Sequence, residues 1–212
     1  MTTRRVHHPL FARVFVWLMS HESREQLEHR RELLDGLSGR VVEVGAGNGR
    51  NFALYPDQVS EVVAVEPEPY LRRLAVQAAG SAPVPVRVID GLADRLPFDP
   101  GAFDAAVTSL VLCSVFDQGQ ALAELHRVIR PGGELRFYEH VVADEARLAR
   151  AQRLADRLFW PHVGGGCHTS RDTGGAITAA GFQLQRCTRL SVRPSPLMAL
   201  VAPHILGAAL RP

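Results

Sequence analysis

The chain of 212 residues contains no lysine, because all 24 of its basic residues are arginine. This absence excludes a lysine nucleophile, a Schiff base and the lysine of a P-loop nucleotide site. The formal net charge is only +2, so the strongly basic field that nucleic-acid binding requires is missing as well. We therefore expect a small-molecule partner and no nucleic acid.

Cysteines and long apolar runs are also scarce. Cys113, Cys167 and Cys187 are an odd number at wide spacing, which gives no disulfide framework and favours a reducing cytoplasm. The most apolar segment, residues 9–19, is interrupted by Arg13 and is shorter than the roughly 20 residues of a membrane span. No signal-peptide cleavage site follows it. We expect a hydrophobic helix that covers a pocket or touches a membrane surface. Of these two alternatives, contact with a membrane is the less expected.

The first forty residues have the periodicity of helices. Phe11, Phe15 and Leu18 share one face at helical spacing, and residues 21–37 continue as a charged amphipathic helix that should stop at Gly36 or Gly39. We expect residues 1–40 to form a helical cover on a domain of residues 41–212, the whole being a single domain. An apolar content of 46% suits one core of this size.

From residue 40 onward, short β-branched runs alternate with amphipathic helical stretches. The predicted strands cover 40–45, 60–67, 84–90, 103–112 and 133–141, and the predicted helices cover 69–79, 120–130, 144–160 and 172–180. Such alternation predicts βαβ units and a mostly parallel sheet with helices on both faces, an α/β Rossmann-like fold. Residues 181–190 and 203–210 should add an antiparallel pair at the sheet edge, giving seven strands.

The sequence VEVGAGNGRN, residues 42–51, places glycine at every second position directly after the first predicted strand. Glycines there permit tight turning and positive φ, and they let the backbone approach a ligand closely. The dinucleotide fingerprint G-x-G-x-x-G is not matched, because Arg50 stands where its third small residue belongs. With no lysine for a Tyr-x-x-x-Lys motif either, an NAD-dependent oxidoreductase is the weaker alternative.

Two acids flank this loop. Glu43 lies inside the strand, where it can face a cationic group or the amide donors of the loop. Glu66 ends the next strand, about twenty residues further on, where a carboxylate can accept hydrogen bonds from both ribose hydroxyls. The loop GLADRLPFDPGAFDAAV, after the third strand, can contact an adenine edge. A nucleotide-like ligand is therefore expected at this edge of the sheet.

Together, EVGAGNGRN, AVEPEPY, GLADRLPFDPGAFDAAVTSLVLCSV and ELHRVIRPGGELRFYEH resemble the class I S-adenosylmethionine-dependent methyltransferases over residues 41–140. The resemblance implies S-adenosylmethionine as cofactor, with the glycine loop at its methionine part, Glu66 at the ribose and Ala93 with Asp94 at the adenine. Relatives commonly carry an acid where this chain has Leu92, and Asp94 or Asp90 would compensate. The expected cofactor-binding residues are Glu43, Gly45, Ala46, Gly47, Gly49, Asn51, Glu66, Pro67, Leu92, Ala93, Asp94, Ser109 and Leu110.

The segments SLVLCSV, RPGGELRFYEHV, FWPHVGGGCHTSRDT and APHILGAAL further resemble the methyltransferase-like thiol S-methyltransferases. This resemblance implies methyl transfer to a small, hydrophobic thiol. Methylation of oxygen, nitrogen or carbon on a natural product or lipid-like molecule is the alternative, and a non-catalytic protein that retains the fold is a third interpretation. The resemblance leaves the oligomeric state open.

His140 is the candidate catalytic residue, because it follows the fifth strand on the ligand side and histidine acts as a base near neutrality. Cys113 is expected in the core. His162, Cys167 and His168 have no fourth partner at a defined spacing, so we predict no metal site from them. The aromatic residues of 11–17 and 159–160 belong to segments expected to roof the acceptor pocket.

Overall fold

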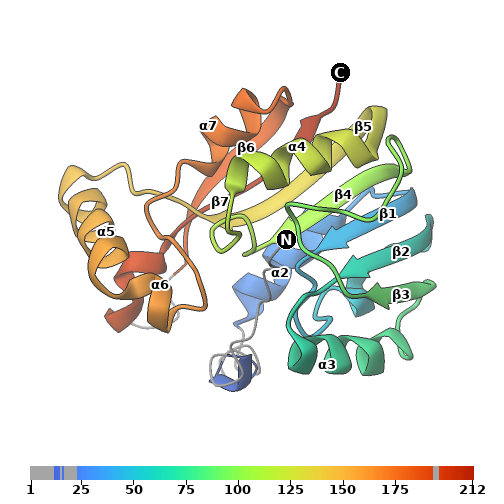
Figure 1. Ribbon diagram of the computed structural model, residues 1–212, viewed down its shortest axis with the longest axis horizontal. Coiled ribbons are helices and arrows are strands. Elements are labelled where there is room, and N and C mark those ends of the chain that lie inside the picture. Colours follow the sequence, from blue (N-terminus) through green and yellow to red (C-terminus); the bar gives the residue numbers. More distant parts are fainter. Residues whose placement is uncertain (1–11, 15, 17–22, 193–195) are drawn as a thin grey trace, which may run out of the picture.

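The computed structural model describes residues 12–14, 16, 23–192 and 196–212, and its strands form one sheet in the order β3-β2-β1-β4-β5-β7-β6 (Figure 1). The strands are β1 (Gly39–Val44), β2 (Val59–Val65), β3 (Val86–Ile89), β4 (Phe103–Ser109), β5 (Ile129–His140), β6 (Gln183–Ser191) and β7 (Pro203–Leu210). The first five pair in parallel, and β7 runs antiparallel to both β5 and β6. The predicted seven-stranded, mostly parallel sheet is confirmed. Its strand order reverses between β1 and β4, at the centre.

Helices cover both faces of the sheet, and the side chains of the central strands alternate between them. The helices are α2 (Arg24–Leu34), η1 (Phe52–Leu54), α3 (Pro69–Ala79), α4 (Gln118–Val128), α5 (Ala146–Leu158), α6 (Trp160–Val163), α7 (Thr173–Ala179) and η2 (Pro196–Val201). Val42 and Val44 of β1 join the core cluster that includes α4 and α7, whereas Val41 joins the cluster that includes α2 and α3. The continuous β-branched run therefore reflects a strand buried on both faces.

The N-terminal part of the chain reaches the core through α2. Ser23 and Gln26 form a capping box at its start, and Gly36, with φ of 73°, ends it as predicted. Leu33 and Leu34 of α2 are buried against the sheet. Residues 12–14 and 16 are helical, in line with the apolar helix predicted over 9–19, but Phe11, Phe15, Trp17 and Leu18 lie outside the described residues.

Several element boundaries differ from the sequence predictions. The strand predicted over 103–112 stops at Ser109, because Leu110 adopts a left-handed φ of 61° that no strand can continue through. The helix predicted to 130 ends at Val128, and β5 already begins at Ile129. The helix predicted over 144–160 is two helices, because Phe159 has a φ of −154° and breaks α5 from α6.

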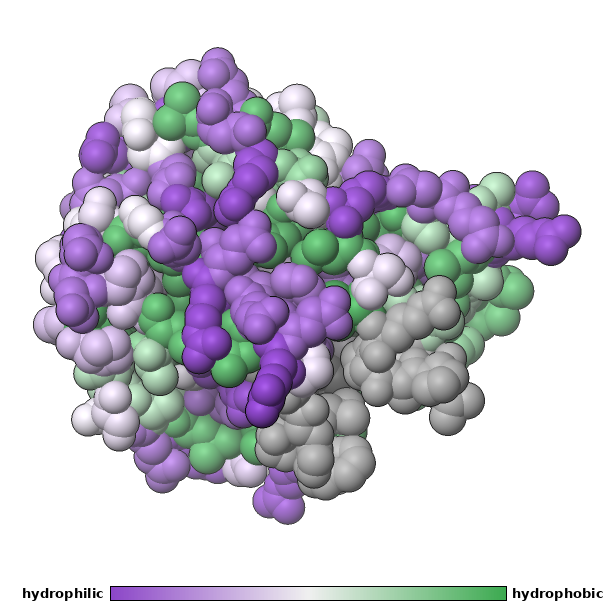
Figure 2. Space-filling model, turned by 180° about the vertical axis from the view of Figure 1, so that it is seen from behind, coloured by the Kyte–Doolittle hydropathy of each residue, from purple (hydrophilic) through white to green (hydrophobic). Residues whose placement is uncertain are grey.

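Exposed apolar side chains concentrate on α5 and α6, which project from one side of the molecule (Figure 1). The exposed apolar side chains of this region are Leu154, Leu158, Phe159 and Val163. Elsewhere on the face shown in Figure 2, hydrophilic residues cover most of the surface and hydrophobic ones are interspersed, as is usual for folded proteins. Among the described residues, no helix combines the length and apolar character needed to cross a bilayer.

Candidate active site

A cleft lies at the carboxyl ends of β1, β2 and β4, next to the reversal of strand order. Open α/β sheets bind their ligands at this position. The cleft holds about 1000 Å³ of empty space, part of it open solvent. It is lined by Ala12, Val44, Gly45, Gly47, Val65, Glu66, Pro67, Glu68, Leu71, Gly91, Leu92, Ala93, Asp94, Ser109, Leu110, Val111, Ser114, Val115, Phe116 and Gly165.

The three alternating glycines have different roles. All have positive φ, 72° at Gly45, 58° at Gly47 and 80° at Gly49. A Cβ at Gly45 would lie 2.3 Å from the Val111 side chain, and a Cβ at Gly49 would lie 2.8 Å from that of Ala78 on α3. Gly45 and Gly47 border the cleft, whereas Gly49 lets the loop pack on α3. Cofactor contact by Gly49 therefore stays a prediction.

Glu66 follows β2 and borders the cleft although it is buried. Its two carboxylate oxygens accept hydrogen bonds from the backbone N–H groups of Gly47 at 2.8 Å and Glu68 at 2.9 Å. Burial raises the pKa of Glu66 to about 7, against the lowering effect of these two hydrogen bonds. A carboxylate can accept about four hydrogen bonds, so lone pairs remain for ligand hydroxyls. The glycine loop and Glu66 are thus locked to each other at the same edge of the cleft.

Glu43 lies beneath the glycine loop in a closed hydrogen-bond network. It accepts from the Asn51 amide and from the Tyr55 hydroxyl, both at 2.8 Å, and burial raises its pKa to about 7. Arg30 of α2 donates to Asn51 at 2.9 Å and to the Ser109 hydroxyl at 3.0 Å. Glu43, Ala46 and Asn51 line a smaller hollow behind the loop rather than the main cleft. Their role in cofactor binding stays a prediction, and the structure gives Glu43 and Asn51 a supporting position.

The loop after β3 forms the opposite wall of the cleft with Leu92, Ala93 and Asp94. The chain turns tightly there, since the Arg95 N–H donates to the Leu92 carbonyl at 3.1 Å. Asp90 instead points to the surface, where it is 71% exposed and pairs with Arg72 at 3.0 Å. Of the two acids considered for the adenine side, only Asp94 therefore lies at the cleft.

The segment after β4 enters the cleft with a strained backbone. Leu110 is the one non-glycine residue with positive φ in the part of the chain that the structure describes. Its N–H donates to the Tyr138 carbonyl at 2.7 Å, and the Val111 N–H donates to the buried carboxylate of Glu139 at 2.9 Å. Burial raises the pKa of Glu139 to about 7. Such strain persists only where the surroundings over-determine it, and it is typical of ligand-binding positions.

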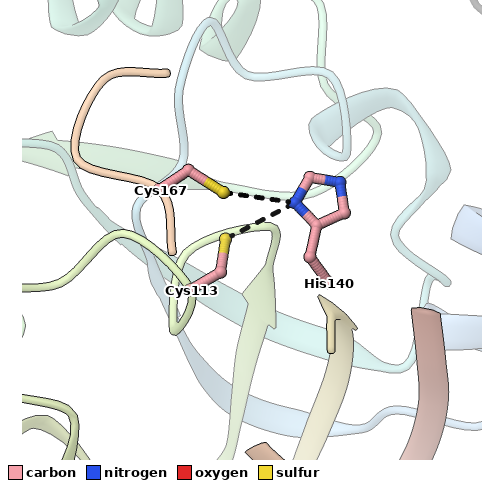
Figure 3. A group of neighbouring side chains, drawn as sticks. All are labelled: Cys113, His140 and Cys167. Atoms are coloured by element: carbon pink, nitrogen blue, oxygen red, sulfur yellow. Dashed lines mark hydrogen bonds between the residues drawn. The ribbon is translucent and has the colours of Figure 1, made fainter. Parts of the chain in front are cut away.

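His140 does not line the cleft. Its ring instead faces the sulfur atoms of Cys113 and Cys167 (Figure 3). Its Nδ1 lies 3.7 Å from the Cys113 sulfur and 3.6 Å from the Cys167 sulfur. Cys113 is buried, as predicted. A hydrogen bond between the two sulfurs raises the pKa of Cys113 well above its usual value and lowers that of Cys167. The catalytic role of His140 stays a prediction, and its ring is not part of the cleft lining.

Residues 164–171 are fastened to the segment after β4. Arg171 donates to the Leu112 carbonyl at 2.6 Å and to the Val115 carbonyl at 2.8 Å. The His168 N–H donates to the Cys113 carbonyl at 2.8 Å. His162 and His168 do not join Cys167 in a group of possible metal ligands among the described residues. These bonds bring Gly165 to the wall of the cleft.

Sequence reasoning missed several residues of the site. Leu71 and Phe116 line the cleft, and Arg30 braces it from α2. Leu71 could have been found, since it lies one helical turn after Glu66 and Pro67 at the ligand edge. Arg30 and Gly165 carry no local signal, because only the folded chain brings them to the glycine loop and the segment after β4.

Comparison with known proteins identifies the class. A family model of the methyltransferase domain matches residues 42–137. The fold resembles a geranyl diphosphate C-methyltransferase from Streptomyces coelicolor A3(2), with a TM-score of 0.72, 18% identity, and 92% of this chain and 82% of that one covered. It also resembles the [4+2]-cyclase SpnF, with a TM-score of 0.69, 20% identity, and coverage of 91% and 83%. With the cleft and its residues, these define a class I S-adenosylmethionine-dependent methyltransferase.

Curated relatives narrow the class to a family. Thiol S-methyltransferase TMT1B of Mus musculus is 33% identical over 93% of this chain and 84% of its own length. Thiol S-methyltransferase TMT1A of Homo sapiens is 30% identical over 91% of this chain and 80% of its own. The chain belongs to the family of these thiol S-methyltransferases.

Proposed function

We propose that the protein transfers a methyl group from S-adenosylmethionine to a small hydrophobic thiol. The observation that carries the cofactor assignment is Glu66, a buried carboxylate held against the glycine loop by the Gly47 N–H at 2.8 Å and open to the cleft. The similarity to thiol S-methyltransferases along most of the chain supports the thiol acceptor. Similarity of fold alone would not support a thiol acceptor, because a cyclase shares this fold.

The residues present suit the proposed cofactor. Gly47 offers bare backbone at the cleft, and Glu66 keeps lone pairs for two hydroxyls. Leu92 and Ala93 offer an apolar surface suited to a flat base. When bound, S-adenosylmethionine supplies a methyl group on a positively charged sulfonium.

The protein's own contribution would be positioning and exclusion of water. Holding two reactants in line can contribute about 7–11 kcal/mol to lowering the barrier. Val111, Val115 and Phe116 give the cleft an apolar end where a hydrophobic thiol would pack. Only about 3% of a free thiol with pKa near 8.5 is thiolate at pH 7, and charge is neutralised as thiolate meets sulfonium, so a water-poor end favours the reaction.

A labelled-methyl assay across small thiols, phenols and amines tests the proposal. We expect labelled thioether from apolar thiols, and no label transfer by a Gly47→Val variant that binds no cofactor. Product from oxygen or nitrogen acceptors alone would refute the thiol acceptor while leaving the methyltransferase class intact. Cofactor binding without turnover on any acceptor would instead favour a non-catalytic protein.

The proposal includes a cytoplasmic location and residues 1–40 as a cover over the domain of residues 41–212. The odd number of cysteines supports the cytoplasmic location. The position of Ala12 in the wall of the cleft supports the cover. Subcellular fractionation tests the location. Deletion of residues 1–22 tests the cover, because it should weaken acceptor binding more than cofactor binding.

A further inference from the structure

Three soft donor atoms from distant parts of the chain converge at one point behind the cleft (Figure 3). Cys113 lies in the segment after β4, His140 is the last residue of β5, and Cys167 follows α6. Their ligand atoms all lie within 4.8 Å of one another. Cys113 is 1% exposed and Cys167 is 6% exposed, whereas His140 is half-buried.

The three groups lie at hydrogen-bond distance, and the two sulfurs also hydrogen-bond to each other. Both sulfurs approach the same ring nitrogen, Nδ1 of His140, at 3.7 Å and 3.6 Å. An imidazole nitrogen carries either one proton or one lone pair, so it makes one good hydrogen bond in its ring plane. A second sulfur at the same distance gains little from that nitrogen. A shared cation would make all three contacts favourable together.

The distances match a tetrahedral cation site. With Zn–S near 2.3 Å and Zn–N near 2.0–2.1 Å, tetrahedral angles put a ligating sulfur and nitrogen roughly 3.5–3.6 Å apart. The observed sulfur–nitrogen separations are 3.7 Å and 3.6 Å. Both sulfur atoms therefore lie at a distance from the His140 Nδ1 atom that suits ligation of one ion.

The charges are compatible with a divalent ion. Two thiolates and a neutral imidazole balance a charge of +2. Burial lowers the pKa of Arg171, and Glu139 and Asp156 oppose this lowering together with the two cysteines. If the metal and the two thiolates form a neutral unit, the carboxylates of Glu139 and Asp156 remain to balance the positive charge of Arg171.

We propose that Cys113, His140 and Cys167 bind one Zn²⁺ ion. No fourth cysteine, histidine or carboxylate belongs to the group within the described residues, so a water molecule or small ligand would complete the coordination. Three protein ligands with one exchangeable position are typical of zinc sites that are not purely structural.

The ion would hold together the two segments that form one end of the cleft. Ser114, next to Cys113, and Gly165, two residues before Cys167, both line it. The inference does not depend on the methyl acceptor, because metal binding is measured without any substrate. Sequence spacing could not reveal the site, since its ligands are separated by 27 residues in each step.

Titration of the metal-free, reduced full-length protein with Co²⁺ tests the proposal. We expect one equivalent to bind, with the visible bands of tetrahedral Co²⁺ and a thiolate charge-transfer band, and Zn²⁺ to displace it. Cys113→Ser, Cys167→Ser and His140→Ala should each weaken binding by more than about 100-fold, which exceeds the usual effect of losing a residue that only supports a ligand. Cys187→Ser, which removes the exposed third cysteine, should bind as the unsubstituted protein does.

Absence of stoichiometric binding by the unsubstituted protein would overturn the proposal, and this result does not require any variant to fold. Binding that persists in both cysteine variants would place the metal elsewhere. A Cys113–Cys167 disulfide formed under mild oxidation, together with no Co²⁺ binding by the reduced protein, would identify a redox pair instead. Circular dichroism of each variant distinguishes loss of the site from loss of the fold.

Discussion

The two sides of the cleft are built in different ways. The side at β1 and β2 has backbone amides and carboxylates that lie close in sequence, from Gly45 to Glu68. The side after β4 consists of mostly apolar side chains from residues 109–116, completed by Ala12 and Gly165 from distant segments. The β1–β2 side therefore has the polar groups to hold a nucleotide-like cofactor. The other has the adaptable apolar surface suited to an acceptor.

Substitution at the glycine loop should have the largest effect on cofactor binding. Gly47→Val should abolish cofactor binding, because a branched side chain at a φ of 58° would enter the cleft and strain the loop. Calorimetric titration with S-adenosylhomocysteine measures this. Gly101→Val is the matched control, since Gly101 has a φ of 68° but lies against Arg130, away from the cleft. Normal binding by the Gly47 variant would remove the loop from the site.

Loss of the buried carboxylate should have the next largest effect. Glu66→Ala should weaken cofactor binding by roughly 1.5–3 kcal/mol, the scale of hydrogen bonds to a charged group, which corresponds to about 10- to 150-fold. Glu61→Ala is the control, because Glu61 lies on β2, the strand before Glu66, but pairs with Arg40 at the surface. Equal affinities of the two folded variants would exclude Glu66 as a ligand of the cofactor.

The pH dependence of cofactor binding should follow Glu66. The pKa of Glu66 is raised to about 7. The ionised carboxylate, which accepts the hydrogen bonds, therefore predominates above pH 7 and becomes protonated as the pH falls below 7. Affinity for S-adenosylhomocysteine should therefore drop about tenfold between pH 8 and pH 6. Glu43 and Glu139 also have pKa values near 7, and Glu66→Gln separates their effects. A variant that keeps the full pH dependence would assign it to another group.

The smallest expected effect lies on the acceptor side. Phe116 is 48% exposed and lines the cleft, so Phe116→Ala should raise KM for an apolar acceptor about fivefold, corresponding to roughly 1 kcal/mol of lost burial. Cofactor affinity should not change, which is the reverse of the effect at Glu66. Phe159→Ala is the control, because Phe159 is equally exposed at 47% but does not line the cleft. Equal acceptor KM values for both variants would place the acceptor elsewhere.

The residues of the β1–β2 side could be singled out in the sequence because the pattern that marks them is local. A β-branched run, alternating glycines and an acid at the end of the next strand define a backbone shape and a charge without reference to the rest of the chain. Gly45, Gly47 and Glu66 accordingly border the cleft as expected. The antiparallel pair formed by β6 and β7 at the sheet edge was also predicted from the sequence.

The other side could not be predicted in the same way, because its contacts are tertiary. His140 is on the ligand side of β5, but only the folding of residues 164–171 onto the segment after β4 places two sulfurs against its ring. The left-handed Leu110 ends β4 three residues early, and no local pattern marks it, since leucine rarely adopts that conformation. Arg30 reaches Asn51 and Ser109 from a helix preceding the sheet.

A crystal structure of the protein with S-adenosylhomocysteine tests the central claim most directly. The account predicts that both ribose hydroxyls donate to the Glu66 carboxylate and that the homocysteine part lies on the backbone of Gly45–Gly47, with its sulfur directed to residues 109–116. An adenosyl group that lies in another hollow, or a ribose that leaves Glu66 uncontacted, would contradict it.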